Sequence, residues 1–173
     1  MQATQTVRRW MTPAVRSVHA NDSIDEAIDL VVRVGQSVVP VVDEADALRG
    51  ILSDRSLLRW LANRVYTDDG TEVSAGDRAV LPPRVLSPDD DLFSAVQAFL
   101  ETAASALPVV HEGRLVAMLG RREALAGVQL AEQEHVRQNA KRRKQARLSE
   151  RRPQSIERMQ QVVADNDKEQ VVA

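Results

Sequence analysis

The stretch SVVPVVDEADALRGILSDRSLL (residues 37–58) decides the fold, because the chain carries it a second time as SALPVVHEGRLVAMLGRREAL (residues 105–125). A shift of 68 residues places Ser37 on Ser105 and Pro40 on Pro108. One residue is then lost in the following loop, and Ile51 meets Met118. A match sustained over about fifty positions indicates an internal duplication.

The first copy predicts the element order β-α-β-β-α. A short apolar segment at residues 15–18 precedes helix-start residues at 21–23, and Gly35 is expected to end the helix that follows. The expected buried face of this helix consists of Ile24, Ala27, Ile28, Val31 and Val32. A β-branched strand, a turn, its hairpin partner and a second helix are expected at residues 38–42, 43–46, 48–52 and 53–61.

The second copy predicts the same order, with Val85 and Leu86 as its first apolar segment and a helix start at residues 87–91. The expected buried face of its first helix consists of Leu92, Val96, Phe99 and Leu100. Because one copy of about 50 residues buries too little surface alone, we expect an α/β fold with two units packed sheet to sheet in pseudo-twofold contact.

The predicted domain organisation has four parts. A first unit at residues 7–62 and a second at 81–126 are joined by a connection at 63–80. A polar and basic helical tail follows at residues 127–173, and the sequence leaves open how far it is ordered.

Composition and motifs exclude several classes of protein. The chain has 173 residues and no cysteine, which excludes disulfides and thiol chemistry. It has neither an apolar run near the ~20 residues of a membrane span nor the apolar segment of a signal peptide, so we expect a cytoplasmic protein without membrane contact. Three scattered histidines and the absence of a nucleophile elbow, P-loop or GxGxxG predict neither a metal site nor catalysis. The aspartates at 68–69 and 89–91 are expected to serve turns and caps.

Several segments, in a fixed order and spacing, carry a resemblance to a known family. They are MTPAVRSVHANDSIDEAIDLV (11–31), SVVPVVD (37–43), GILSDRS (50–56), RVLSPDDDLFSAVQAFL (84–100), SALPVV (105–110) and AMLGRRE (117–123). Over about residues 7–126 the chain resembles the CBS-domain pair, also called a Bateman module. The resemblance implies a regulatory module that binds an adenosine-containing ligand between its two units and forms a homodimer through helices.

The resemblance also implies a ligand class and a set of contact residues. The expected ligand is ATP, ADP, AMP or another adenosyl compound, with no cofactor required. In the family motif, Gly, two apolar residues, Thr or Ser, two further residues and Asp occur in that order. The hydroxyl and nearby backbone N–H groups hold phosphate at a helix start, and the Asp accepts hydrogen bonds from the ribose. The implied nucleotide-binding residues are Ser37, Val38, Val39, Pro40, Ser53, Asp54, Arg55, Ser56, Ser105, Leu107, Pro108, Arg121, Arg122 and Glu123.

Neither copy keeps the whole motif. The first copy keeps the glycine and Ser53, but Ser56 stands where the ribose Asp belongs. The second copy has Ala117 for the glycine, Gly120 for the hydroxyl residue and Glu123 at the Asp position. A lost hydrogen bond to a charged group costs roughly 1.5–3 kcal/mol, so the expected binding is weakened.

Each of these polar residues also has an interpretation that needs no ligand. Ser53 is a suitable N-cap for the second helix. Arg121 and Arg122 suit a solvated face, and Glu123 suits an early-helix acid that complements the dipole. The sequence alone leaves both interpretations open.

The tail carries the second feature with functional meaning. Residues 137–152 hold eight Lys/Arg and one Glu, whereas the whole chain has a formal net charge of −2. The segment is rich in helix formers, and Pro153 is expected to interrupt the helix. One interpretation is a solvated helix; the other is capture of a protein or, less favoured because no aromatic follows Phe99, of nucleic acid. The tail residues implied in partner binding are Arg137, Lys141, Arg142, Arg143, Lys144, Arg147, Arg151 and Arg152.

Two function hypotheses result. The first is a non-enzymatic regulatory module that senses an adenosine-containing nucleotide between two CBS units. The alternative is a ligand-free dimerising scaffold whose basic tail binds a protein or nucleic-acid partner.

Overall fold

The computed structural model describes residues 5–13, 16–67 and 72–169, without the side chains of 150–159 and 162–169. The chain divides into two compact units, Met1–Gln129 and Leu130–Ala173.

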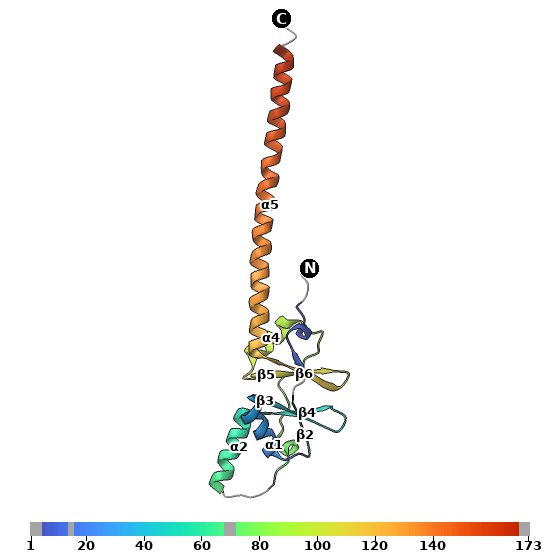
Figure 1. Cartoon of the computed structure of the whole chain (residues 1–173), viewed down its shortest axis with the longest axis vertical. Helices are drawn as coiled ribbons and strands as arrows, with labels where there is room; N and C mark the ends of the chain where they lie inside the picture. Colours follow the sequence, from blue (N-terminus) through green and yellow to red (C-terminus); the bar gives the residue numbers. More distant parts are fainter. Residues whose placement is uncertain (1–4, 14–15, 68–71, 170–173) are drawn as a thin grey trace. The chain divides into compact units, whose positions relative to one another are not determined.

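The first unit contains two three-stranded sheets that lie as two layers (Figure 1). One sheet has the order β2 (Val18–His19), β3 (Val38–Val42) and β4 (Leu48–Ser53), with β2 parallel and β4 antiparallel to β3. The other has the order β1 (Thr12–Pro13), β6 (Arg114–Gly120) and β5 (Ala106–His111). Each repeated hairpin therefore supplies two neighbouring strands of one sheet, which confirms the predicted α/β fold with tandem units.

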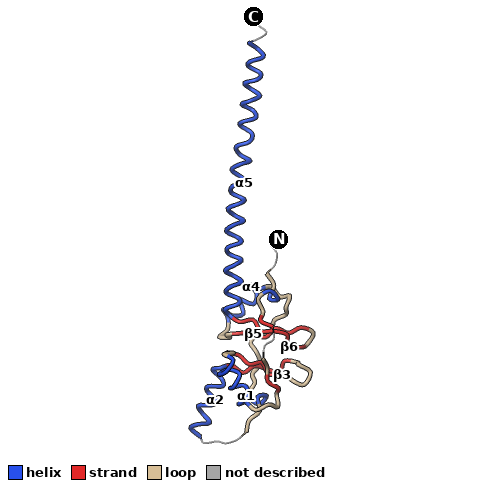
Figure 2. Tube along the Cα trace, viewed as in Figure 1, coloured by secondary structure: helices blue, strands red, loops and turns tan. Residues whose placement is uncertain are grey.

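Helices cover the outer face of each sheet (Figure 2). On the first sheet lie α1 (Ile24–Asp29), its continuation η2 (Leu30–Val34) and α2 (Asp54–Thr67). On the second lie α4 (Leu92–Glu101) and the beginning of α5 (Arg121–Glu169). Two short helices, η1 (Val7–Arg9) and α3 (Ala75–Arg78), precede the first and second copy.

The predicted buried faces of α1 and α4 each include one residue that is exposed. Val32 is 75% exposed because η2 is a turn of π-helix, which alters the residue spacing that a regular α-helix would keep. Gly35 ends this turn in a left-handed conformation (φ 74°), as predicted. On α4 the buried arc is centred on Ala95, and Leu100, in the last turn, is 82% exposed.

Several element boundaries also differ from the prediction. The second helix extends to Thr67 instead of ending at Leu61, and α3 lies in the predicted connection. The added turns are supported by Arg64, whose guanidinium lies 4.4 Å from the Trp60 ring centroid. The first predicted strand is reduced to β2, with Val15 outside the described residues, and its counterpart is a single bridge from Leu86.

The segment before each copy docks on the other copy. The N–H of Val7 donates to the carbonyl of Asp90 at 2.9 Å, and the equivalent N–H of Ala75 donates to Asp22 at 2.8 Å. Further along, β1 pairs with β6 in the second sheet, whereas Val80 bridges to β4 in the first. This reciprocal exchange follows the pseudo-twofold symmetry of the two copies, and it links each copy to the other.

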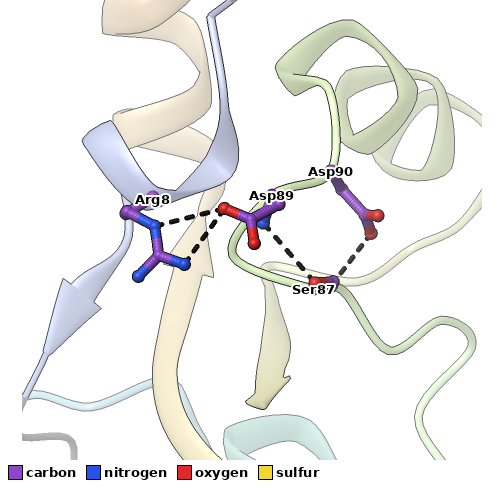
Figure 3. A network of polar contacts seen from close by, with 4 residues as sticks. All are labelled: Arg8, Ser87, Asp89 and Asp90. Carbon is purple, nitrogen blue, oxygen red and sulfur yellow. Dashed lines mark hydrogen bonds and ion pairs between the residues drawn. The ribbon is translucent and has the colours of Figure 1, made fainter.

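Side chains reinforce the exchange at the second copy (Figure 3). Arg8 donates to Oδ1 of Asp89 through Nε at 3.3 Å and Nη2 at 3.0 Å. In the same turn, the N–H of Ser87 donates to Asp90 Oδ2 at 2.9 Å and the N–H of Asp89 to Ser87 Oγ at 3.5 Å. Residues 89–91 thus include the predicted turn chemistry, while residues 68–69 lie outside the described residues.

A small apolar cluster joins the two sheets. Val38, Ile51 and Met118 are each at most 6% exposed and pack together between the layers. The hairpin tips also meet, because the N–H of Leu115 donates to the carbonyl of Asp46 at 3.0 Å. We call this inter-sheet boundary, with the strand ends that meet along it, the seam.

The second unit is the continuation of α5. The helix runs through Pro153 to Glu169, so the predicted interruption is wrong. Proline removes one backbone donor, and the neighbouring residues, rich in Gln, Glu and Arg, retain high helix propensity. Between residues 132 and 149 every residue except Asn139 is exposed, so this part has no packed face within the described chain.

Candidate functional site

Two equivalent serines meet at the seam. Ser37 precedes β3, the middle strand of its sheet, and Ser105 precedes β5, an edge strand of the other sheet. Their Oγ atoms lie 3.3 Å apart. The carbonyl of Ser37 accepts from the N–H of Asp54 at 2.9 Å, and that of Ser105 accepts from Arg121 at 3.1 Å. Each serine is therefore bonded to the first residue of the helix that follows its hairpin, which brings both helix N-termini to this region.

The turn between β4 and α2 is closed by two serines. Oγ of Ser53 accepts from the N–H of Ser56 at 3.1 Å, and Oγ of Ser56 accepts from the N–H of Ser53 at 2.9 Å. Ser56 also donates to the carbonyl of Ser53 at 2.8 Å. Ser53 has the capping role, and its own proton is used by no described hydrogen bond. It can still donate to a phosphate oxygen, whereas Ser56 offers only acceptor capacity to a ribose hydroxyl.

The corresponding turn between β6 and α5 has a different chemistry. Gly120 replaces the capping hydroxyl, and the carboxylate of Glu123 lies against it in the space that a side chain at 120 would need. Arg121 donates from Nη2 to the carbonyl of Thr102 at 3.3 Å. Arg121 and Arg122 are exposed, so their guanidinium groups are accessible to an anion.

The apolar residues predicted at the site form its support. Val38 and Val39 are 4% and 0% exposed, Leu107 is 0% exposed, and both strand prolines, Pro40 and Pro108, are buried. The structure therefore brings the serines and charged residues together at strand ends, with these five residues packed behind them. Asp54 and Arg55 are exposed at the start of α2, where Asp54 Oδ1 accepts from the N–H of Arg55 at 2.5 Å.

Exposed apolar residues beside β4 were missed by the sequence-based prediction. Val80 pairs with Ile51, two residues before Ser53, and is 56% exposed; Leu81 follows it and is 83% exposed. The available hint was their place in AGDRAVLPP (75–83), the segment that leads into the second copy. Together they offer apolar surface close to the capped turn.

The basic residues of the tail lie on the second unit. The described ones are exposed, and Arg143, Lys144 and Arg147 share a strip of the helix with Val136 and Ala140. The side chains of Arg151 and Arg152 lie outside the described residues. The exposed basic side chains of the described tail are Arg137, Lys141, Arg142, Arg143, Lys144 and Arg147.

Neither a metal-binding group nor a membrane-spanning helix is found among the described residues. They contain no group of three or more His, Asp or Glu side chains placed to hold a metal ion. Within the same part of the chain, no helix is both long and apolar enough to cross a bilayer.

The duplicated hairpins, the exchange of leading segments and the seam point to one family. A family model described as the CBS domain matches residues 7–63 and 78–129. The chain belongs to the CBS domain family. It is a CBS pair followed by a long C-terminal helix.

Solved structures agree with this assignment. The structure of CBSX2 in complex with AMP is 28% identical, with a TM-score of 0.63, and covers 73% of this chain and 98% of its own. The structure of CBSX2 from Arabidopsis thaliana is 27% identical, with a TM-score of 0.64, and covers 76% of this chain and 99% of its own.

Two curated relatives share the CBS part. The uncharacterized protein MJ1225 of Methanocaldococcus jannaschii is 28% identical over 115 residues, and a homoserine O-acetyltransferase of Methanohalophilus mahii is 29% identical over 115 residues. Each match covers 66% of this chain but only 40% and 22% of the relatives' own lengths. The chain thus spans less than half of either relative.

Proposed function

We propose that this CBS pair is a non-enzymatic regulatory module that binds an adenosine-containing mononucleotide, AMP first among them, at the seam. The meeting of Ser37, Ser53 and Ser105 with both helix N-termini carries the proposal, because hydroxyls and the positive ends of helix dipoles suit phosphate. The complex of CBSX2 with AMP supports the choice of ligand.

The proposed ligand has a polar and an apolar end, and so has the site. Ser53 donates its free proton to phosphate, with Arg121 and Arg122 supplying positive charge from the second copy. Val80 and Leu81 give the adenine an apolar surface. Ser56 accepts from only one ribose hydroxyl, which predicts weaker binding than a carboxylate at this position would give.

Calorimetry with AMP, ADP, ATP and S-adenosylmethionine tests the proposal. We expect AMP to release or absorb heat at one site per chain and to raise the melting temperature, since a ligand that binds only the folded state stabilises it. Leu81→Glu should abolish this binding. Val32→Glu is the matched control, because Val32 is also exposed but lies on η2. Absence of heat and of stabilisation at millimolar AMP would reject the proposal.

We further propose that the module is a homodimer. Both copies expose the same leucine of the helix after the hairpin, Leu58 at 69% and Leu125 at 70%. Val65 and Tyr66 extend this apolar surface along α2 at 73% and 89% exposure. Sedimentation of the wild type should give a dimer, and Leu58→Glu with Leu125→Glu should give a monomer with an unchanged circular dichroism spectrum. A monomeric wild type would reject it.

As a second candidate function, we propose that the tail binds the phosphate backbone of nucleic acid. It is favoured by one observation, the exposure of six basic side chains between residues 137 and 147 of one continuous helix. Substitution of Lys141, Arg142, Arg143 and Lys144 by Gln, a good helix former, should abolish binding to a labelled DNA duplex at low salt. The proposal is rejected if the anisotropy titration of this variant matches that of the wild type, or if the wild type does not bind at about 50 mM salt. The tail would then be interpreted as a solvated or protein-binding helix.

A further inference from the structure

A hollow lies in the first copy, on the outer side of its sheet. It has a volume of about 290 Å³ and lies along α2 and the segment that leads into the second copy. Its floor is apolar, with Ile24, Leu52 and Leu57 each at most 3% exposed. Arg59, Trp60 and Arg78 stand around it. We call it the α2 pocket.

The repeat shows that this hollow is particular to the first copy. In the second copy, the position of Arg78 is occupied by Trp10 and that of Trp60 by Gly127. The Trp10 ring packs on Gly127 so closely that an added Cβ would lie 3.0 Å from its Cε2 atom. Trp10, from the segment before the first copy, thus fills this space in the second copy with its indole ring. Arg78, from the segment before the second copy, supplies a cation to the first copy and leaves the space open.

The charges around the α2 pocket are not balanced. Arg64 pairs with Asp25 at 3.1 Å and lies over Trp60, so its charge is matched. Among the described residues, no carboxylate forms an ion pair with Arg59 or Arg78. The nearby carboxylate of Asp77 is engaged by the hydroxyl of Ser74 at 2.8 Å.

We propose that the α2 pocket binds a small organic anion, a phosphate ester or carboxylate carried on a single apolar ring or short chain. Arg59 and Arg78 hold the oxyanion, for which guanidinium groups are well suited. The apolar part contacts Leu57 and Trp60. The volume is at the low end for ligand pockets, which fits a compound of one ring and is too small for a dinucleotide.

The pocket shares Ser56 with the proposed nucleotide site and otherwise extends away from it. It begins near Ser56 and continues along the helix to Asn63 and Thr67, away from the serines that meet at the seam. Arg59 and Arg78 do not contribute to the nucleotide site. A variant of these two arginines therefore tests the α2 pocket without removing a seam residue.

The experiment titrates the 173-residue chain with phenyl phosphate, benzoate and uncharged benzyl alcohol, by calorimetry in a buffer without phosphate. We expect saturable binding of at least one of the two anions and none of benzyl alcohol; the tighter anion identifies the preferred headgroup. Arg59→Gln with Arg78→Gln should weaken this binding at least about tenfold, as expected for loss of hydrogen bonds to a charged group. Arg33→Gln with Arg49→Gln removes the same charge elsewhere and should leave the affinity within about twofold.

Four outcomes would overturn the proposal. The first is that neither anion binds saturably at 10 mM, and the second is that benzyl alcohol binds as tightly as the anions. The third is that the Arg59 and Arg78 variant binds the anion as the wild type does. The fourth is that AMP displaces the anion stoichiometrically. The last would show that one site serves both ligands. Quenching of tryptophan fluorescence by the bound anion in the wild type, lost in Trp60→Phe, keeps the test decisive if the double variant folds poorly.

Discussion

Ser37 and Ser105 occupy the same position of the repeat, and their hydroxyl oxygens lie 3.3 Å apart on the seam. A residue can approach its own repeat-equivalent this closely only near a twofold axis. The axis of the CBS pair therefore passes close to these two side chains. Because either oxygen can be the donor, the pair is a shared contact that neither copy makes alone.

The first prediction concerns this pair. We expect the Ser37→Ala and Ser105→Ala substitutions to be coupled by about 0.5–1.5 kcal/mol in a double-mutant cycle, the net contribution of one hydrogen bond. Urea unfolding of the wild type, both single variants and the double variant measures it. Strictly additive effects would mean that the hydroxyls contact other groups in solution.

The hairpins, the seam and the capped turn were predictable from the sequence, because they depend on local patterns. The β-branched runs, Gly35 and Ser53 each act within a few residues of themselves. The exchange of leading segments was not predictable, since residues 6–13 and 73–80 are too short to show a side-chain periodicity; they dock through backbone hydrogen bonds and the burial of Val7 and Ala75. The exposure of Val80 and Leu81 follows from that docking and was missed for the same reason.

The second prediction compares two neighbours in the exchanged segment. Val7 is fully buried, so Val7→Ala should destabilise the chain by about 2 kcal/mol through lost apolar burial and a cavity. Arg8 pairs with Asp89, but their side chains are 53% and 69% exposed. Arg8→Gln should therefore cost less than about 1 kcal/mol. Denaturant midpoints measure both, and a larger effect at Arg8 would contradict the view that burial holds this segment in place.

The third prediction concerns the glycine of the ligand motif. A Cβ on Gly50 would lie 2.8 Å from Cβ of Ala79 and 3.0 Å from the carbonyl oxygen of Val80. Gly50→Ala should therefore cost about 1–3 kcal/mol by overpacking the leading segment. Ala117, its counterpart, already carries the methyl group, so Ala117→Gly should cost only about 0.5–1 kcal/mol through backbone entropy. Thermal unfolding of both variants measures the two costs. If Gly50→Ala left the stability unchanged, the leading segment would be free to shift away from the added methyl group.

The fourth prediction concerns the missing ribose acceptor. Ser56→Asp places a carboxylate where Ser56 accepts from the N–H of Ser53, and should strengthen AMP binding roughly tenfold or more, since hydrogen bonds to a charged group contribute about 1.5–3 kcal/mol. Ser56→Asn introduces a side chain of the same shape as Asp but without its charge, and should give a smaller gain in AMP affinity. Calorimetry measures both, and equal affinities for AMP in wild type and Ser56→Asp would place the ribose elsewhere.

The fifth prediction is a pH dependence in the first hairpin. The backbone N–H groups of Ala47 and Ala45 donate to Asp43 at 2.9 Å each, and together with Arg49 they lower the pKa of this carboxyl below its ordinary value. A carboxyl with a lower pKa in the folded state stabilises the fold above its unfolded-state pKa of about 4 and loses this effect as the pH falls through the folded value. The melting temperature of the wild type should therefore exceed that of Asp43→Asn at pH 7, and the difference should shrink below about pH 4. Glu44→Gln, in the same turn, controls for the loss of one charge, and a difference for Asp43→Asn that stayed constant down to pH 2 would show that the carboxylate form makes no special contribution.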